Sequence, residues 1–322
     1  MLNYIIRRTL ILIPTLIVTT FIIYAIVVWT PGNPIAVFED PSHPLSQLEK
    51  EKLIEKYGLD KPWYVQYSNW AVLFAQGDMG RSFQWSSAVW PLIRGRIWAT
   101  VQLTGLALIL AFIIAIPIGM ISALKQYSLL DNVITAFAFF GISMPNFWFG
   151  LLLIYGFAVT LNLFPVSGMN TVPEPSASWG FLLDRLHHLV LPVIVLSTAS
   201  IAGFTRYMRS QVLEIMRAEY IDTARAKGLS ARVVNGKHIL KNAMLPLVTL
   251  LGLSLPFIVS GALIIEQVFG WPGLGRFFYT AALGRDYPVI MGILTLTAIV
   301  TLLGNFLADI SYAIVDPRIR YD

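Results

Sequence analysis

Long apolar runs alternate with shorter polar segments along the chain, and this pattern predicts an all-α membrane protein with about six transmembrane helices. The runs occupy residues 10–29, 101–123, 133–164, 189–205, 243–265 and 289–310. Most are close to the roughly 20 residues that a helix needs to cross the hydrocarbon core of a bilayer. The run at 133–164 is longer than one span requires and Pro145 interrupts it, so we expect a bent helix with a polar notch.

The composition supports a protein whose main solvent is lipid. Of the 322 residues, 56% are hydrophobic and only 13% are charged, and the mean hydropathy is +0.68. A soluble domain carries about 25% charged residues. The absence of cysteine excludes disulfides and cysteine-ligated metals. The net charge of +5 does not indicate nucleic acid as a partner, because residues 206–241 alone hold eight Lys and Arg against three Asp and Glu.

The flanking charges predict the orientation of the chain. Arg7, Arg8, Arg318 and Arg320 place both termini in the cytoplasm by the positive-inside rule. The first apolar run is longer than the core of a signal peptide and lacks a convincing cleavage site, so we expect an uncleaved helix. The chain therefore divides into an N-terminal transmembrane helix (1–30), an extracellular segment (31–99) and a core of five transmembrane helices (100–322), with a cytoplasmic loop at 206–242.

The extracellular segment combines a charged helix with a dense set of aromatic residues. The stretch 45–57 has the pattern of an amphipathic helix that Gly58 ends. The aromatic residues that follow suit a membrane interface or a small aromatic core outside the bilayer, and these two roles are compatible. They are Trp63, Tyr64, Tyr67, Trp70, Trp85, Trp90 and Trp98.

The stretch 213–246, which lies between two apolar runs, has the pattern of two short helices bent at a glycine. Its first part predicts one apolar stripe on a helix with a charged back. The stripe consists of Leu213, Met216, Tyr220 and Ala224. Gly228 is placed to end this helix in the left-handed conformation, and Ser230 to cap the second helix. Two such helices at a membrane surface suit insertion into a cleft on another protein, whereas the plain alternative is a solvated basic loop.

This stretch resembles the EAA loop of ABC-transporter permeases, the segment that docks on the ATPase subunit. The resemblance is carried by Asp222-Thr223-Ala224 and by Gly228 at the family's distance. Asp222 and Thr223 replace the usual Glu and first Ala, and Pro246 lies further from the glycine than usual. Both departures resemble the dipeptide/oligopeptide permease branch. The resemblance implies an ATPase-coupling loop of Glu219, Tyr220, Asp222, Thr223, Ala224, Arg225, Ala226, Lys227, Gly228, His238 and Asn242.

Further motifs extend the resemblance over nearly the whole chain. They lie at residues 4–8, 31–34, 271–275, 285–288 and 316–320. The resemblance implies a permease subunit of an ATP-driven dipeptide or oligopeptide importer in the cell membrane, which forms the translocation path by alternating access. It implies as partners a second homologous permease, two ATPase subunits that hold ATP and Mg, an extracellular substrate-binding protein, the peptide substrate and membrane lipid. This chain itself is expected to bind no cofactor, metal or nucleic acid.

The motifs that would give the chain an enzymatic activity of its own are missing. Gly236-Lys237 is followed by His238 rather than by Ser or Thr and lacks the upstream glycine, so no phosphate-binding loop is present. There is no Gly-x-Ser-x-Gly elbow and no His-Glu-x-x-His helix. His187 and His188 are adjacent and point to different faces of a helix, which disfavours a metal site. We therefore expect a transport subunit rather than an enzyme.

Polar residues inside the apolar runs are candidates for the translocation path. An amide beside aromatic rings could contact a peptide backbone without reading its sequence, or could equally hold helices together. Glu266 and Asp309 lie at the ends of spans, where a carboxylate can reach interfacial water, so we interpret them as structural. The path candidates are Ser143, Asn146, Phe147, Trp148 and Asn305.

Three alternative functions remain open. Nickel and glutathione permeases share this branch, and the presence of only four histidines argues weakly against nickel. An ion-coupled secondary transporter would need ionisable groups within several spans, and the sequence has almost none there. A membrane enzyme would need a cluster of catalytic residues, and none is evident.

Overall fold

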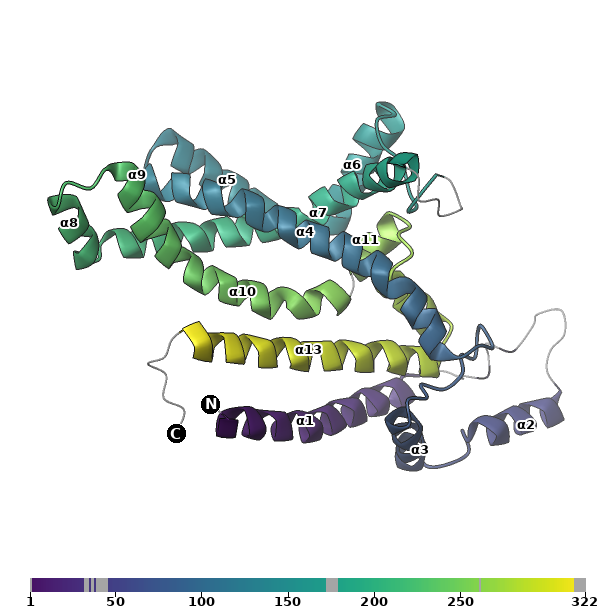
Figure 1. The fold of residues 1–322 in the computed structure, drawn as a ribbon. Coiled ribbons are helices and arrows are strands. Elements are labelled where there is room, and N and C mark those ends of the chain that lie inside the picture. Colours follow the sequence, from purple (N-terminus) through teal and green to yellow (C-terminus); the bar gives the residue numbers. More distant parts are fainter. Residues whose placement is uncertain are drawn as a thin grey trace. The chain divides into compact units, whose positions relative to one another are not determined.

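The computed structural model describes residues 2–31, 35, 38, 46–171, 179–260 and 262–315, and the regular elements in these residues are helices (Figure 1). The predicted all-α class is therefore confirmed. In chain order the elements are α1 Leu2–Trp29, α2 Gln47–Tyr57, α3 Trp63–Ala75, α4 Val89–Leu124, α5 Leu129–Ser143, α6 Asn146–Leu153, the π-helix η2 Ile154–Thr160, α7 Trp179–Met216, α8 Glu219–Ala226, α9 Ala231–Val233, the π-helix η3 Val234–Leu240, α10 Lys241–Ser260, α11 Leu263–Val268, α12 Leu274–Leu283 and α13 Tyr287–Val315.

Four helices among the described residues, α1, α4, α7 and α13, are long and apolar enough to cross a membrane. A fifth candidate is the pair formed by α5 and α6–η2, which is bent by 102°. Met144 lies at the bend with an extended backbone (ψ 124°), the conformation that a following proline imposes. The predicted bend at Pro145 is thus confirmed. Helix α10 occupies most of the remaining predicted span, 243–265, and the total of six stays a prediction.

Segments that lie between the predicted apolar runs are partly helical. Helix α7 begins at Trp179 rather than at 189, and it continues to Met216 through the first part of the predicted 206–242 loop. The segment 266–288 contains the end of α11 and all of α12. The glycines and proline of 270–275 concealed α12, although its buried residues Leu274, Phe277 and Ala281 follow the helical spacing i, i+3, i+7.

Helix α2 forms where the sequence predicts a helix, and a capping box begins it. The Ser46 hydroxyl accepts a hydrogen bond from the backbone N–H of Glu49 at 3.4 Å, and the Glu49 carboxylate accepts one from the backbone N–H of Ser46 at 2.9 Å. The hydrogen bonds from Ser46 hold the pKa of Glu49 below its ordinary value. Gly58 follows the helix with φ 63°, which confirms the predicted left-handed end.

The contacts of the chain divide it into two units. The first unit comprises residues 1–99, 259–263 and 272–322, and the second comprises 100–258 and 264–271. The predicted division at 30 and 99 concerns position in a membrane, so these contacts do not test it.

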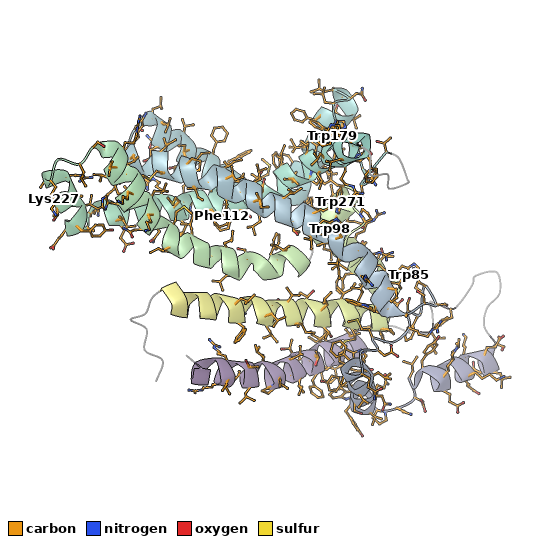
Figure 2. The ribbon with its side chains drawn as sticks, viewed as in Figure 1. Trp85, Trp98, Phe112, Trp179, Lys227 and Trp271 are labelled. Carbon is orange, nitrogen blue, oxygen red and sulfur yellow. The ribbon has the colours of Figure 1, made fainter. Side chains whose placement is uncertain are left out.

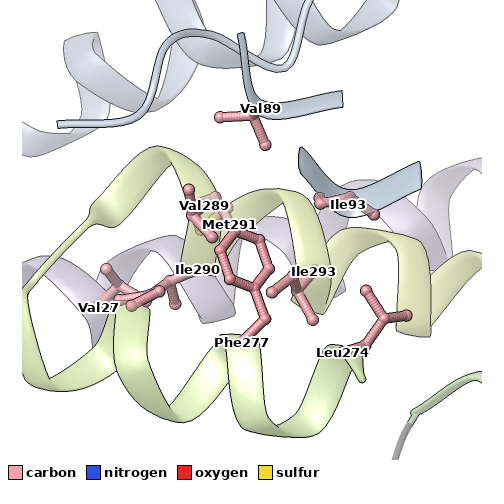
Figure 3. Close-up of a cluster of buried hydrophobic side chains, with 10 residues drawn as sticks. Val27, Val89, Ile93, Leu274, Phe277, Val289, Ile290, Met291 and Ile293 are labelled. Atoms are coloured by element: carbon pink, nitrogen blue, oxygen red, sulfur yellow. The ribbon is translucent and has the colours of Figure 1, made fainter. Parts of the chain in front are cut away.

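In the first unit, α1 and α13 pack along one another (Figure 1). Its core gathers apolar side chains from α1, α12, α13 and the start of α4 (Figure 3). Val89 and Ile93 are fully buried there. Gly292 permits this packing, because a Cβ at that position would lie 2.9 Å from side-chain atoms of both residues.

In the second unit, α5 and α6 pack against α7. Helices α4 and α7 approach closely at Gly119. A Cβ there would lie 2.7 Å from the Cβ of Met208 and 2.8 Å from the carbonyl oxygen of Thr205. The small residue is therefore required by this helix crossing.

Candidate functional site

The charged stretch after α7 folds into a turn, a short helix and a second turn, which together form a projecting loop. Helix α7 ends at Met216, where the backbone N–H groups of Arg217 and Ala218 bond to the carbonyl oxygens of Glu214 and Ile215 at 3.2 and 3.0 Å. Helix α8 then begins at Glu219. The predicted stripe 213–224 therefore does not lie on one helix, and that prediction is wrong.

Helix α8 buries one apolar edge and exposes the rest of its surface. Ile221 is 0% exposed and Ala224 is also buried, whereas Tyr220 is 47% exposed. The apolar face therefore runs through Ile221 rather than through Tyr220, because the break after Met216 resets the helical phase. The side chain of Asp222 is 71% exposed and lies 3.3 Å from Arg225. The remaining exposed residues of this surface are Glu219, Thr223, Ala226 and Lys227, the last at the far end of α8 (Figure 2).

The turn after α8 has the left-handed geometry that the sequence predicts. Gly228 has φ 75°, and its N–H bonds to the carbonyl oxygen of Arg225 at 2.9 Å. A Cβ at Gly228 would meet no atom within 4 Å, so the requirement for glycine is conformational rather than steric.

The second helix of the loop differs from the prediction. Ser230 has the extended backbone of an N-cap, but its side chain makes no capping hydrogen bond. Helix α9 is followed without a break by η3 and α10. The predicted second short helix is thus continuous with the next predicted span, and is not a separate helix.

His238 and Asn242 join this surface from the second helix. The amide nitrogen of Asn242 donates to the hydroxyl of Tyr220 at 3.3 Å and to the carbonyl oxygen of His238 at 2.7 Å. The structure therefore brings these two predicted residues beside α8, across a gap of more than ten positions in the sequence.

The buried side of α8 packs in an apolar cluster. Ile221 and Ala224 belong to one buried cluster with residues of α4, α7, η3 and α10. These are Ala123 of α4, Met208 and Val212 of α7, and Val234, Ile239, Ala243 and Leu247 of η3 and α10. Burying a side chain such as Ile221 contributes about 1.5–3 kcal/mol. The loop is consequently a packed structure with a polar outer surface, unlike a solvated connection.

A buried ion pair near this cluster was not anticipated from the sequence. Asp131, at the start of α5, is 2% exposed. Its two carboxylate oxygens accept hydrogen bonds from Nε and Nη2 of Arg209 on α7 at 2.8 and 2.9 Å. The hydroxyl of Ser122 and the backbone N–H of Tyr127 also donate to this carboxylate. The four donors tie the α4–α5 turn to α7.

The sequence contains a signal for the position of Asp131, although not for its partner Arg209. Ser128 caps α5, and its hydroxyl accepts from the backbone N–H of Asp131 at 3.2 Å. The Ser-x-x-Asp spacing marks a helix start. It does not reveal Arg209, which lies 78 positions away.

The path candidates fall in two places. Ser143, Asn146, Phe147 and Trp148 surround the bend between α5 and α6, and three of them line a hollow of about 460 Å³ there, from which Asn146 is absent. The rings of Phe147 and Trp148 are about half exposed. Asn305 is exposed on α13, in the first unit. Ser143, Phe147, Trp148 and Asn305 thus lie at an open surface. The role of all five candidates in a path stays a prediction.

The acidic and imidazole groups have protein partners. Glu266 is fully buried and accepts a hydrogen bond from the Thr100 hydroxyl at 2.8 Å, so the expectation that it reaches interfacial water is wrong. A ring nitrogen of His187 lies 2.7 Å from the carbonyl oxygen of Leu163, and one of His188 lies 2.9 Å from that of Asp184. The side chain of Asp309 is outside the described residues.

Comparison with known proteins agrees with this architecture. The pattern of a family described as "Binding-protein-dependent transport system inner membrane component" matches residues 115–321. The chain is 46% identical over 319 residues to the oligopeptide transport system permease protein AppB of Bacillus subtilis (strain 168), with 99% of each chain covered. It is 38% identical over 338 residues to the dipeptide transport system permease protein DppB of Escherichia coli (strain K12), with 100% of this chain and 99% of the relative covered.

A solved structure shows the same fold. The inward-facing MetNI methionine ABC transporter superposes with a TM-score of 0.54 at 20% identity, covering 69% of this chain and 96% of that chain. Apolar helices joined by a packed polar loop thus define a multi-pass membrane protein with the fold of an ABC-transporter permease. The chain belongs to the family of binding-protein-dependent transport system inner membrane components.

Proposed function

We propose that this chain is the permease subunit of an ATP-driven importer of dipeptides or oligopeptides. The family supplies the transport role, and the names of the relatives, which cover the chain from end to end, favour peptides over nickel or glutathione. The observation that supports the coupling mechanism is the way α8 is packed. Its apolar edge is buried in a cluster shared with α4, α7, η3 and α10, while a charged surface faces outward.

The exposed surface of α8 is the part that would enter a cleft on an ATPase subunit. Asp222, Arg225 and Lys227 offer charges of both signs for that contact. Because Ile221 shares one buried cluster with residues of α7, η3 and α10, we expect a displacement of α8 to be transmitted to these elements. ATP and Mg belong to the partner, since the chain has no phosphate-binding loop.

The remaining partners follow from the same assignment. Two permeases, two ATPase subunits and an extracellular binding protein would form the complete importer, with this chain embedded in the cell membrane and both termini in the cytoplasm. The residues at the α5–α6 bend, together with Asn305, are our candidates for the path. An amide such as Asn146 suits contact with peptide backbone groups of any sequence.

The decisive experiment is import by the reconstituted complex. Proteoliposomes that contain both permeases and the ATPase subunits are loaded with ATP, and uptake of a labelled dipeptide is measured with the binding protein outside. We expect uptake that requires ATP and is unchanged when ion gradients are collapsed. Uptake that follows an ion gradient without ATP would instead support a secondary transporter.

A matched pair of variants tests the loop. Gly228→Val places a β-branched residue at φ 75°, a conformation that costs roughly 1 kcal/mol or more. Gly236→Val is the control, because Gly236 lies in η3, outside the left-handed region, and has equally open surroundings. We expect Gly228→Val to insert normally but to lose ATPase subunits on purification and to lose import. Normal import by Gly228→Val would refute the role of this turn.

A further inference from the structure

The first unit contains a small cavity beside the start of α4 that the proposed transport role does not use. Its volume is about 200 Å³. This is less than the roughly 300–1,000 Å³ of sites that enclose a whole small molecule, so the cavity suits one compact group of a larger ligand. Its lining combines Trp85 and Arg96 with residues at the start of α12, among them Arg276 and Phe277.

The cation of Arg96 has no countercharge among the described residues. Its Nη1 donates to the carbonyl oxygen of Leu92 at 2.7 Å, and its guanidinium carbon lies 4.0 Å from the centroid of the Phe277 ring. It forms no ion pair with a described residue, and no acidic residue lines the cavity. Arg96 is partly buried, and a cation in such a position is normally paired. Since a guanidinium has five N–H donors, several remain for an anion that enters the cavity.

The position of Arg96 along α4 places this anion at the surface of a bilayer. The charge-free apolar run 101–123 begins five residues after Arg96, which is about 7.5 Å along a helix axis. The headgroup layer on each side of the hydrocarbon core is roughly 5–8 Å thick. Trp90 and Trp98 are exposed before and after Arg96 on α4, and tryptophan is typical of this level. In a membrane, the anions at this level are the phosphates of the lipids.

We propose that this cavity binds the phosphate of an anionic phospholipid such as phosphatidylglycerol. Arg96 would donate to the phosphate oxygens, with Arg276 beside it in the same lining. The volume admits a headgroup phosphate but not the acyl chains, which would stay in the bilayer. A phosphate held in this way would link α4 to α12. The site does not depend on the transported substrate, and only its assignment to the outer leaflet rests on the proposed topology.

The test is lipid binding to the complete permease–ATPase complex in detergent, measured by native mass spectrometry. The apparent Kd of the tightest phosphatidylglycerol is compared with that of phosphatidylcholine, whose headgroup has no net charge. We expect the parent complex to prefer phosphatidylglycerol. Arg96→Gln should weaken its Kd about 10-fold, the effect of hydrogen bonds to a charged group. Arg276→Gln, at an exposed position, should weaken it about 2- to 5-fold.

Arg94→Gln is the matched control for charge at this depth. Arg94 lies two positions before Arg96 on α4, is exposed and does not line the cavity, so its removal should leave the Kd unchanged. A second arm adds inorganic phosphate in large excess at constant ionic strength. It should not displace the lipid, because it lacks the acyl chains that supply most of the apolar contact.

The proposal is overturned if the two lipids bind equally or if Arg96→Gln binds phosphatidylglycerol as tightly as Arg94→Gln. It is also overturned if inorganic phosphate displaces the lipid, since the cavity would then be a site for free phosphate. The Tm of the lipid-free complex shows whether Arg96→Gln folds normally. If its Tm falls, Arg276→Gln decides, because replacing an exposed side chain leaves the core intact. An unchanged Kd in that variant refutes the site.

Discussion

Removing Arg209 tests how α4, α5 and α7 are held together in the second unit. In Arg209→Ala the Asp131 carboxylate stays buried at 2% exposure and keeps the Ser122 hydroxyl and the Tyr127 N–H, but it loses its countercharge. Breaking a buried pair by deleting one partner costs about 3–5 kcal/mol. The Ser122 and Tyr127 donors still stabilise the carboxylate, so the cost should lie at the lower end of this range. We therefore expect a loss of about 3 kcal/mol in the free energy of unfolding.

Two further variants separate the contribution of the charge from that of the hydrogen-bond geometry and provide a control. Arg209→Lys keeps the charge but cannot reproduce the two parallel hydrogen bonds to Asp131, so the expected loss is smaller, about 1–2 kcal/mol. Arg206→Ala is the control on the same helix. Its guanidinium is exposed and lies 5.6 Å from the ring of Phe139, so its removal should cost no more than about 0.5–1 kcal/mol.

The assay is unfolding of the purified chain in one detergent, with the double variant Asp131→Ala/Arg209→Ala completing the cycle. If the pair stabilises as argued, the double variant is less destabilised than the sum of the two single ones, because no charge is left buried without a partner. A double variant that loses the full sum, or an Arg209→Ala as stable as Arg206→Ala, refutes the reasoning. In the reconstituted complex, Arg209→Ala should lower import more than ATP hydrolysis, since α7 also carries α8.

Other predictions concern packing, orientation and activity. Gly119→Ala should destabilise the chain by about 1–3 kcal/mol, because the new methyl group overlaps Met208 and the backbone of Thr205, whereas Gly105→Ala on the same helix meets no atom within 4 Å and should be neutral by thermal unfolding. In this cysteine-free chain, Ser46→Cys and Ser176→Cys should react with an impermeant thiol reagent from outside and Ser230→Cys only from inside; Ser176 lies outside the described residues, and labelling of Ser230→Cys in intact cells would reverse the orientation. The purified chain alone should show no ATPase activity, and turnover without an added ATPase subunit would contradict the assignment of ATP hydrolysis to a partner.

Local patterns in the sequence predicted the local structure well. The left-handed end of α2 at Gly58, the bend at Pro145 and the left-handed turn at Gly228 depend on a few neighbouring residues, and all three are present. Each follows from what one residue type does to its own backbone or to the next turn, so no knowledge of the tertiary fold was needed.

The features that the sequence analysis missed or misread depend on contacts or breaks outside the local pattern. Arg209 meets Asp131 from 78 positions away, and a lone arginine in a basic stretch gives no sign of such a partner. The phase of α8 could not be read across the turn after Met216, which shifted the apparent apolar stripe from Ile221 to Tyr220. Helix α12 was hidden because glycine and proline at 270–275 indicate a loop, although they only precede the helix start at Leu274.

Helix α8 is held in place by contacts with other elements rather than by its own stability. A short helix with only two buried positions, Ile221 and Ala224, has little stability of its own. It is held by Ile221 in the shared cluster, by the hydrogen bond from Asn242 to Tyr220, and by Gly228, which turns the chain back toward α10. The exposed charged residues Asp222 and Arg225 take no part in these contacts. If the proposed function is correct, a displacement of α8 by a partner would pass to the elements that share this cluster, and we expect the Asp131–Arg209 pair to extend it to the α4–α5 turn.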